Sequence, residues 1–441
     1  MKTSGWSRLF VLVILAALIG CTATPAVTPT GDAMQNPSDA QPASLKSAKE
    51  RTLNPDVPAE DLTALTNGLT AFSADLYRQL SSQEGNLFFS PYSISLALAM
   101  TQAGAAGETR AQIDAALHYT LEGERLHAAF NALDQELARR ATEVVESESE
   151  ANPFQLKVAN SLWGQRDYPF RSEYLDLLAT NYGAGLQVVD FKQNTEQARQ
   201  AINDWIAQAT EQKIKDIIPE GGLNAMSRLV LANAIYFNAS WLTPFETEFT
   251  KDEAFNLLDG SQKTVPMMHK TDRYGYVDGD TFQLVELPYI SQNLVMDVLV
   301  PDEGQLAVFE QSLDAERLKS IFEQIGSSEV ELGLPRFKFE ASTGLSSTLK
   351  AMGMQAAFDP NSADFSNLAD TDELFLQDVL HKAYISVDEA GTEAAAATVV
   401  MVGATGAQLE PVKLTVDRPF LFLIRDTGTG AILFFGRVTN P

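Results

Sequence analysis

From residue 61 onward, large hydrophobic residues follow a helical spacing at first and a strand-like spacing later. Between residues 61 and 80 they recur every three or four positions, which predicts a helix with one buried stripe. Residues 91–103 are apolar on nearly every side, so this helix is expected inside the core, with Pro91 in its first turn and Ser90 at its N-cap. Further helices are predicted at residues 108–117, 122–146, 173–182, 195–213, 305–311 and 315–324.

Short apolar runs typical of strands dominate the second half of the chain. Residues 228–237 have the length and apolar density of a central strand, and residues 420–425 and 431–438 predict a closing hairpin with Gly428 and Gly430 at its turn. Other strands are expected at residues 156–164, 187–190, 329–339 and 263–300, the last broken by Gly275, Gly279 and Pro288. Helices first and strands later predict an α+β fold with large antiparallel sheets.

One segment near the C-terminus suits both a loop and a strand. A charged pair, Asp388 and Glu389, precedes Gly391, and small or β-branched residues follow. In an extended chain alternate residues share a face, so Glu393 points away from the face formed by Thr392, Ala394, Ala396, Thr398, Val400 and Val402. The alternative is an alanine-rich linker or a piece of helix, because alanine is the best helix former.

The N-terminal residues have the pattern of an export signal. Basic residues flank the start of an apolar run, residues 9–19, that is too short for a permanent membrane helix. The run ends in Leu18-Ile19-Gly20-Cys21, which resembles a bacterial lipobox, whose cysteine becomes lipid-modified after cleavage. Cys21 is also the only cysteine, so the chain has no internal disulfide. The alternative is an ordinary secretory signal with an incidental cysteine.

These features divide the chain into three parts. We expect a lipoprotein signal peptide at residues 1–20, a disordered tether at residues 21–59, rich in Ala, Pro, Thr, Ser and Asp, and a folded domain at residues 60–441. The protein is therefore expected to be secreted and lipid-anchored to a bacterial cell envelope, on the extracytoplasmic side. Its contact with the membrane is expected through the lipid anchor only.

Composition argues against several classes of function. The 58 acidic and 32 basic residues among 441 give a formal net charge of −26, which disfavours binding to nucleic acid or to anionic lipid. Hydrophobic residues make up 45 %, enough for a large core. The four histidines lack metal-ligand spacing, and no G-x-S-x-G elbow, P-loop or zincin motif occurs. We therefore expect no enzyme, no metal and no cofactor.

Five motifs stand in a definite order along the chain. They are Asn86-Leu87-Phe88-Phe89-Ser90-Pro91, Leu231-Ala232-Asn233-Ala234, His381-Lys382-Ala383-Tyr384, Arg418-Pro419-Phe420 and Phe434-Phe435-Gly436-Arg437. In this order and spacing, the chain from about residue 60 to its end resembles the serpin family of protease inhibitors. The resemblance implies a serpin-like fold, with N-terminal helices packed on large, mostly antiparallel β-sheets. It also implies an exposed reactive loop, about residues 389–411.

The resemblance implies an inhibitor of serine endopeptidases that each molecule uses once. A protease attacks the loop as a substrate and forms an acyl-enzyme, and the cleaved loop inserts into the main sheet before water resolves the ester. Gly391 would supply the bend, and Thr392, expected near the top of the sheet, the first buried side chain. The implied hinge residues are Glu389, Gly391, Thr392, Glu393, Ala394, Ala395, Ala396 and Ala397.

Four polar residues of apolar segments need partners, because an unpaired polar group in a core is costly. Ser90, Ser93, Asn233 and His381 are either four separately satisfied groups or, as the resemblance implies, one cluster beneath the main sheet where its strands part. The resemblance places Trp241 at the top of that opening, and the alternative is a large core residue.

The implied reactive bond is Thr405–Gly406, counted from the hinge glutamate, whereas counting back from Pro419 gives a position near Gln408. We prefer the hinge count because the inserted length is mechanically constrained. Small residues before the bond suit elastase-like or subtilisin-like proteases. Lys and Arg are absent from residues 383–411, which argues against trypsin-like targets. The expected partner is thus a serine protease in covalent complex with a monomeric inhibitor.

Two other functions remain open at this stage. One is a lipoprotein of serpin fold that binds a ligand or partner without trapping proteases. The other is a solute-binding lipoprotein of a transporter, which alternating βα units would favour and the strand-rich second half opposes.

Overall fold

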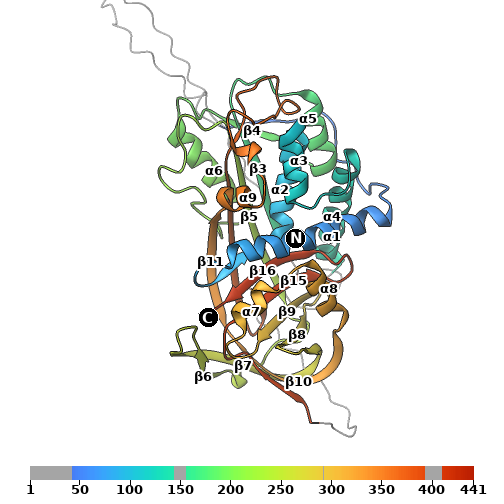
Figure 1. Cartoon of the computed structure of the whole chain (residues 1–441), viewed down its shortest axis with the longest axis vertical. Coiled ribbons are helices and arrows are strands. Elements are labelled where there is room, and N and C mark those ends of the chain that lie inside the picture. Colours follow the sequence, from blue (N-terminus) through green and yellow to red (C-terminus); the bar gives the residue numbers. More distant parts are fainter. Residues whose placement is uncertain (1–41, 144–154, 292, 393–409) are drawn as a thin grey trace, which may run out of the picture. The chain divides into compact units, whose positions relative to one another are not determined.

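The computed structural model describes residues 42–143, 155–291, 293–392 and 410–441. The helices of the first half, α1 to α5, gather in one group (Figure 1). The helices are α1 (Ala59–Leu80), α2 (Pro91–Gly104), α3 (Gly107–Ala116), α4 (Glu124–Glu143), α5 (Ser172–Leu177) with a π-helical turn η3 (Leu178–Tyr182), α6 (Thr195–Ala209), α7 (Leu306–Gln311), α8 (Ala315–Glu323) and α9 (Ser346–Ala351), with short 3₁₀ turns η4 (Thr247–Phe249) and η5 (Ala356–Phe358).

The strands form two sheets. The main sheet has the order β1 (Ala43–Leu45), β4 (Leu186–Val189), β3 (Gln155–Gln165), β5 (Leu229–Ser240), β13 (Gly391–Thr392), β12 (Leu376–Asp388) and β11 (Phe337–Gly344). The second sheet has the order β14 (Val412–Thr415), β10 (Gly326–Pro335), β7 (Gln262–Asp278), β8 (Phe282–Pro288), β9 (Leu294–Pro301), β15 (Phe420–Asp426), β16 (Ile432–Val438) and β2 (Leu87–Phe89), with β6 (Lys251–Asn256) beside β7. Most pairings are antiparallel, so the predicted α+β class with large, mostly antiparallel sheets is confirmed.

Both faces of the main sheet are covered by helices. Along β5, Val230 and Ala232 pack in the cluster that contains α6, whereas Leu229 and Leu231 pack in the cluster that contains α2. This alternation follows from strand geometry, which sends successive side chains to opposite faces. A central strand buried on both faces reads as a continuous apolar run, which is why residues 228–237 were recognisable in the sequence. The inner face, toward α2, is the face that matters below.

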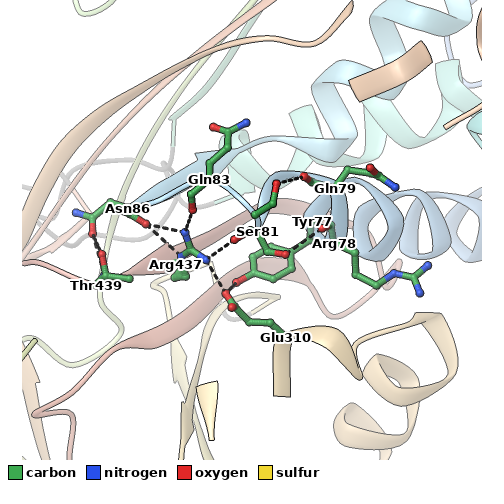
Figure 2. A network of polar contacts seen from close by, with 11 residues as sticks. Tyr77, Arg78, Gln79, Ser81, Gln83, Asn86, Glu310, Arg437 and Thr439 are labelled. Atoms are coloured by element: carbon green, nitrogen blue, oxygen red, sulfur yellow. Dashed lines mark hydrogen bonds and ion pairs between the residues drawn. The ribbon is translucent and has the colours of Figure 1, made fainter. Parts of the chain in front are cut away.

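The last residues of the chain are fixed to the end of the first helix (Figure 2). Arg437 of β16 donates hydrogen bonds to the backbone oxygens of Ser81 (3.0 Å) and Gly85 (3.1 Å) and to the carboxylate of Glu310 (2.9 Å). Glu310 also accepts a bond from the Tyr77 hydroxyl (2.5 Å). Arginine suits this position because its guanidinium offers five donors in a rigid fork. The hairpin β15–β16 is thereby joined to α1 and α7.

Part of the segment predicted as a disordered tether is ordered. Residues 42–58, here called the N-terminal arm, lie on the folded domain. β1 pairs antiparallel with β4, and Arg51 donates to Asn131 (2.8 Å) and to Asp134 (2.7 Å). The predicted boundary between tether and domain is therefore wrong, because residues 42–58 belong to the folded domain. The polar composition of the arm gave no sign of these partners, which lie far away in the sequence.

Two element predictions also differ from the structure. The helix expected to residue 213 ends at Ala209, because Glu211 and Gln212 adopt left-handed backbone with φ of 52° and 65°. Gly275 was expected to break a strand but lies inside β7. A Cβ there would come within 2.8 Å of Ile325 and 2.9 Å of Glu286, so close packing explains this glycine.

In the part of the chain that the structure describes, every helix is too short or too polar to cross a membrane.

Candidate functional site

The main sheet divides into a fork at its centre. β5 and β12 run parallel and pair directly from Leu229 with Leu376 to Tyr236 with Tyr384. Beyond that level they separate, and β13 lies between them, antiparallel to both. The segment that the sequence marked as loop or strand therefore begins as a strand, inside the sheet.

A tight turn brings the chain from β12 back into the fork. The carboxylate of Asp388 accepts the backbone N–H of Ala390 (2.9 Å). Gly391 follows with φ of 152°, and a Cβ at this position would lie 2.2 Å from the carbonyl oxygen of Ala239. Only glycine fits such a close backbone approach, so the bend predicted at Gly391 has a steric cause.

The carboxylate of Glu389 is held by one arginine and one hydroxyl from outside the hinge. Its carboxylate accepts Arg336 Nε (2.8 Å) and a second Arg336 N–H, together with the Thr250 hydroxyl. Burial alone would raise the pKa of Glu389, but these hydrogen bonds hold that pKa below its ordinary value. Its backbone oxygen accepts the Phe245 N–H (2.9 Å). Glu389 is therefore an ionised anchor at the start of the hinge.

Thr392 is already buried in the uncleaved protein. It is 1 % exposed, and its hydroxyl lies 2.7 Å from the Tyr289 hydroxyl. The exposed reactive loop was predicted from about residue 389, so its first four residues correct that boundary: Glu389, Ala390, Gly391 and Thr392 are all buried. The prediction failed because pairing on two sides stabilises even a two-residue strand.

Trp241 closes the top of the fork. Its indole N–H donates to the Asp388 carbonyl (3.0 Å), and its ring stacks on Tyr289 with centroids 4.6 Å apart. Its backbone N–H donates to the Ala390 carbonyl (2.9 Å). Trp241 is thus in direct contact with the turn, whereas its part in sheet opening stays a prediction. Sequence reasoning missed Tyr289, which follows β8 in the second sheet.

Lower in the sheet, the four predicted polar residues meet beneath β5 and β12. The Ser90 backbone N–H donates to His381 Nε2 (3.1 Å), and the Asn233 amide donates to the Ser93 hydroxyl (2.7 Å). Ser90 is also the N-cap of α2, accepting the Ser93 N–H at 3.1 Å. The geometry of one cluster is therefore present, whereas its part in sheet opening stays a prediction.

His381 is neutral, with a defined tautomer. A backbone N–H can only donate, so Nε2 accepts from Ser90 and Nδ1 carries the proton that is donated to Asn233 Oδ1. Burial lowers the pKa of His381 to about 3. A charged ring would present a second proton to the Ser90 N–H.

One further member of this cluster, Asn160 on β3, was not predicted from the sequence. Its side chain accepts from the Ser93 hydroxyl (3.0 Å) and donates to the Ser93 carbonyl (3.1 Å). Asn160 is paired with Asn233, which is paired with His381, so the three form one row across β3, β5 and β12. An asparagine within an apolar strand was the available signal.

Several predicted residues cannot be placed. Glu393, Ala394, Ala395, Ala396, Ala397, the bond Thr405–Gly406 and Cys21 all lie outside the described residues. Within the described residues, no group of three His, Cys, Asp or Glu side chains could hold a metal ion.

The comparisons with known proteins agree with this geometry. Residues 67–441 match the family Serpin (serine protease inhibitor), and the chain belongs to the serpin family. It is 37 % identical to an uncharacterized serpin-like protein of Thermococcus kodakarensis, over 98 % of this chain and 97 % of that protein. It is also 37 % identical to the human leukocyte elastase inhibitor, over 86 % of this chain and 99 % of the inhibitor. The native structure of Tengpin, a thermophilic serpin, superposes with a TM-score of 0.78 at 28 % identity, covering 91 % of this chain and 100 % of Tengpin.

Proposed function

We propose that this serpin inhibits serine endopeptidases by trapping them on its reactive loop. The protease cleaves the loop and forms an acyl-enzyme, and the loop then inserts between β5 and β12. The observation that carries the proposal is β13, because Gly391 and Thr392 already occupy the line along which the sheet must open. The small residues that follow in the sequence suit continued insertion.

The register of β13 defines where the following residues would lie after insertion. Gly391 pairs with Ser240 on one side and Asp388 on the other. Continued in the same register, Ala395 would lie between Tyr236 and Tyr384, which now pair with each other. The register between β5 and β12 is therefore the same before and after insertion. The two strands would only have to separate, with no shift along each other.

The same register brings a hydroxyl to the polar cluster. Thr398 would lie between Asn233 and His381 on the inner face, three pairs below Ala395. Insertion must break the bond between Asn233 and His381, and a threonine at this level offers both a donor and an acceptor in exchange. This match supports the opening role that we assign to the cluster.

The proposed targets are elastase-like or subtilisin-like proteases, cleaving at Thr405–Gly406. The small side chains around this bond and the name of the human relative, a leukocyte elastase inhibitor, support the choice. Incubating the protein with pancreatic elastase should give an adduct that survives SDS and boiling, whereas trypsin should give none. A loop cut by elastase without any adduct would instead indicate a serpin that binds partners without trapping proteases.

We further propose that the inhibitor acts outside the cytoplasm, anchored by lipid on Cys21. The apolar run before Cys21 and the single cysteine of the chain support this anchor. Cys21→Ser should release the protein from the membrane fraction and leave its thermal unfolding unchanged. A variant that still sediments with membranes would show that another feature holds it there.

A further inference from the structure

A tyrosine directly after a strand of the second sheet contacts the hinge in the fork of the main sheet. Tyr289 follows β8, and its hydroxyl lies 2.7 Å from Thr392 Oγ1. Its ring is stacked on Trp241, with planes 13° apart, and meets Phe237 edge-on at 5.2 Å. A bridge between the backbones of Trp241 and Tyr289 fixes the main chain as well. The ring is therefore held firmly, and its hydroxyl has a set position at the mouth of the fork.

The contact between the two hydroxyls is isolated from water. Tyr289 is 0 % exposed and Thr392 is 1 % exposed. Among the described residues, neither hydroxyl has a second hydrogen-bond partner. A buried hydroxyl without a partner is unfavourable, so Thr392 leaving the fork would leave Tyr289 unsatisfied. The bond thus favours the docked position of the hinge over any undocked one.

This contact lies at the start of the docked segment. In the part of the chain that the structure describes, β13 consists of Gly391 and Thr392, and few backbone hydrogen bonds hold these two residues between β5 and β12. Ordering the first residues of a strand costs conformational entropy before later residues add their bonds. A side-chain bond at the first inserted position offsets part of that cost.

We propose that Tyr289 is the positioning residue of the hinge. Its hydroxyl holds Thr392 between β5 and β12 in the uncleaved protein, so that insertion extends a strand that has already begun. The consequence for protease trapping rests on the proposed function, whereas the position of the hinge does not.

The position of the hinge can be measured without a protease. The backbone N–H groups of Trp241 and Phe245 donate to hinge carbonyls, each at 2.9 Å, so both exchange with solvent when the hinge leaves the fork. Tyr289→Phe and Thr392→Val each delete one hydroxyl with little change in shape. In hydrogen-exchange mass spectrometry, each should speed exchange at these amides by about 3- to 10-fold. The double variant should exchange no faster than the faster single variant, because either change already breaks the bond.

A matched control separates this role from general destabilisation. Tyr174 of α5 is also a buried tyrosine, and its hydroxyl donates to the Met100 carbonyl at 3.1 Å. Tyr174→Phe should leave exchange at Trp241 and Phe245 unchanged. Unchanged exchange in Tyr289→Phe, or additive effects of the two hinge substitutions, would overturn the proposal.

The effect on trapping is read from the number of inhibitor molecules consumed per protease. Inhibitor molecules that are cleaved without trapping a protease raise this number above one. In Tyr289→Phe the number of such wasted molecules should rise by up to about 3- to 10-fold, while the rate of loop cleavage stays the same. Faster exchange in a protein whose wild type forms no adduct would refute the proposed function and support the positioning role. If the wild type traps proteases and Tyr289→Phe exchanges faster but consumes the same number of inhibitor molecules per protease, the claim that the bond assists insertion would be refuted.

Discussion

At the scale of single residues, the cluster beneath the main sheet depends on a histidine that carries no charge. Both nitrogens of His381 have defined partners, Ser90 on one side and Asn233 on the other. The arrangement leaves no place for a second proton. Stability should therefore depend on pH through this residue.

The sign of that dependence follows from the two pKa values. Unfolded histidine has a pKa near 6.5, and burial lowers the pKa of folded His381 to about 3, so below pH 6.5 the unfolded state binds the extra proton. The stability contributed by neutral His381 is fully present above pH 6.5 and is lost as the pH falls toward 3. By pH 5 the free energy of unfolding should have fallen by about 2 kcal/mol through this residue. Urea unfolding at pH 8 and pH 5 should show a smaller loss in His381→Gln than in the wild type. His127, buried with a pKa of about 4, is common to both proteins and cancels. Equal losses would contradict the assignment.

Thr392→Arg should convert the inhibitor into a substrate. Thr392 is 1 % exposed, so a guanidinium at this position would lose its hydration, and the hinge should be expelled from the fork. The resting protein should lose about 1–3 kcal/mol of stability, because Tyr289 loses its partner. In gel assays elastase should cut the loop and remain active, without an adduct.

Thr392→Ser keeps the hydroxyl and serves as the control for that substitution. It should trap elastase almost as well as the wild type. Wild-type trapping by Thr392→Arg would mean that the loop does not insert from this hinge.

At the scale of elements, the N-terminal arm connects the edge of the main sheet to the helices. Beyond β1, the Thr52 N–H donates to the Thr180 carbonyl (2.8 Å), and Asp134, which binds Arg51, also accepts the Tyr92 hydroxyl of α2 (2.9 Å). The arm is therefore linked to α2 through Asp134 of α4, and it pairs directly with β4, the strand next to β3.

Arg51→Met should lower the free energy of unfolding by about 1–2 kcal/mol, because two charge-assisted hydrogen bonds of a three-quarters buried guanidinium are lost. Lys49→Met is the control from the same arm, since Lys49 binds Asp176 with its side chain 60 % exposed and should contribute less than about 0.5 kcal/mol. Chemical unfolding compares the two variants. Equal small effects would show that the arm adds little to the fold.

The elements that could be predicted from the sequence are those defined by local periodicity. α1, α2, β5 and the hairpin β15–β16 all lie close to their predicted residues. What could not be predicted depends on distant partners. Tyr289 meets Thr392 across 103 residues, and Arg336 meets Glu389 across 53. The arm has a composition typical of disordered segments, and its partners lie in α4, α5, η3 and β4. No periodicity records such contacts.

At the scale of the whole molecule, the uncleaved fold has its main sheet closed at the polar cluster and open only at the top. β5 and β12 pair directly over most of their length, and Gly391 and Thr392, the last residues described before the gap at 393–409, lie between them at the fork. A longer strand between them would pair on both sides without disturbing the register. Under the proposed mechanism, the cleaved loop would supply this additional strand.

Cleavage of the loop between residues 402 and 409 should for this reason raise the thermal stability. Ten or so newly inserted residues, each adding about 0.5–1.5 kcal/mol of net hydrogen bonding, would contribute on the order of 10 kcal/mol. The unfolding temperature, measured by scanning calorimetry before and after limited proteolysis, should rise by at least about 10 °C. The same cleavage in Thr392→Arg should give little rise, because its hinge cannot enter the fork. A cleaved wild type that melts with the intact protein would rule out insertion, and with it the trapping mechanism.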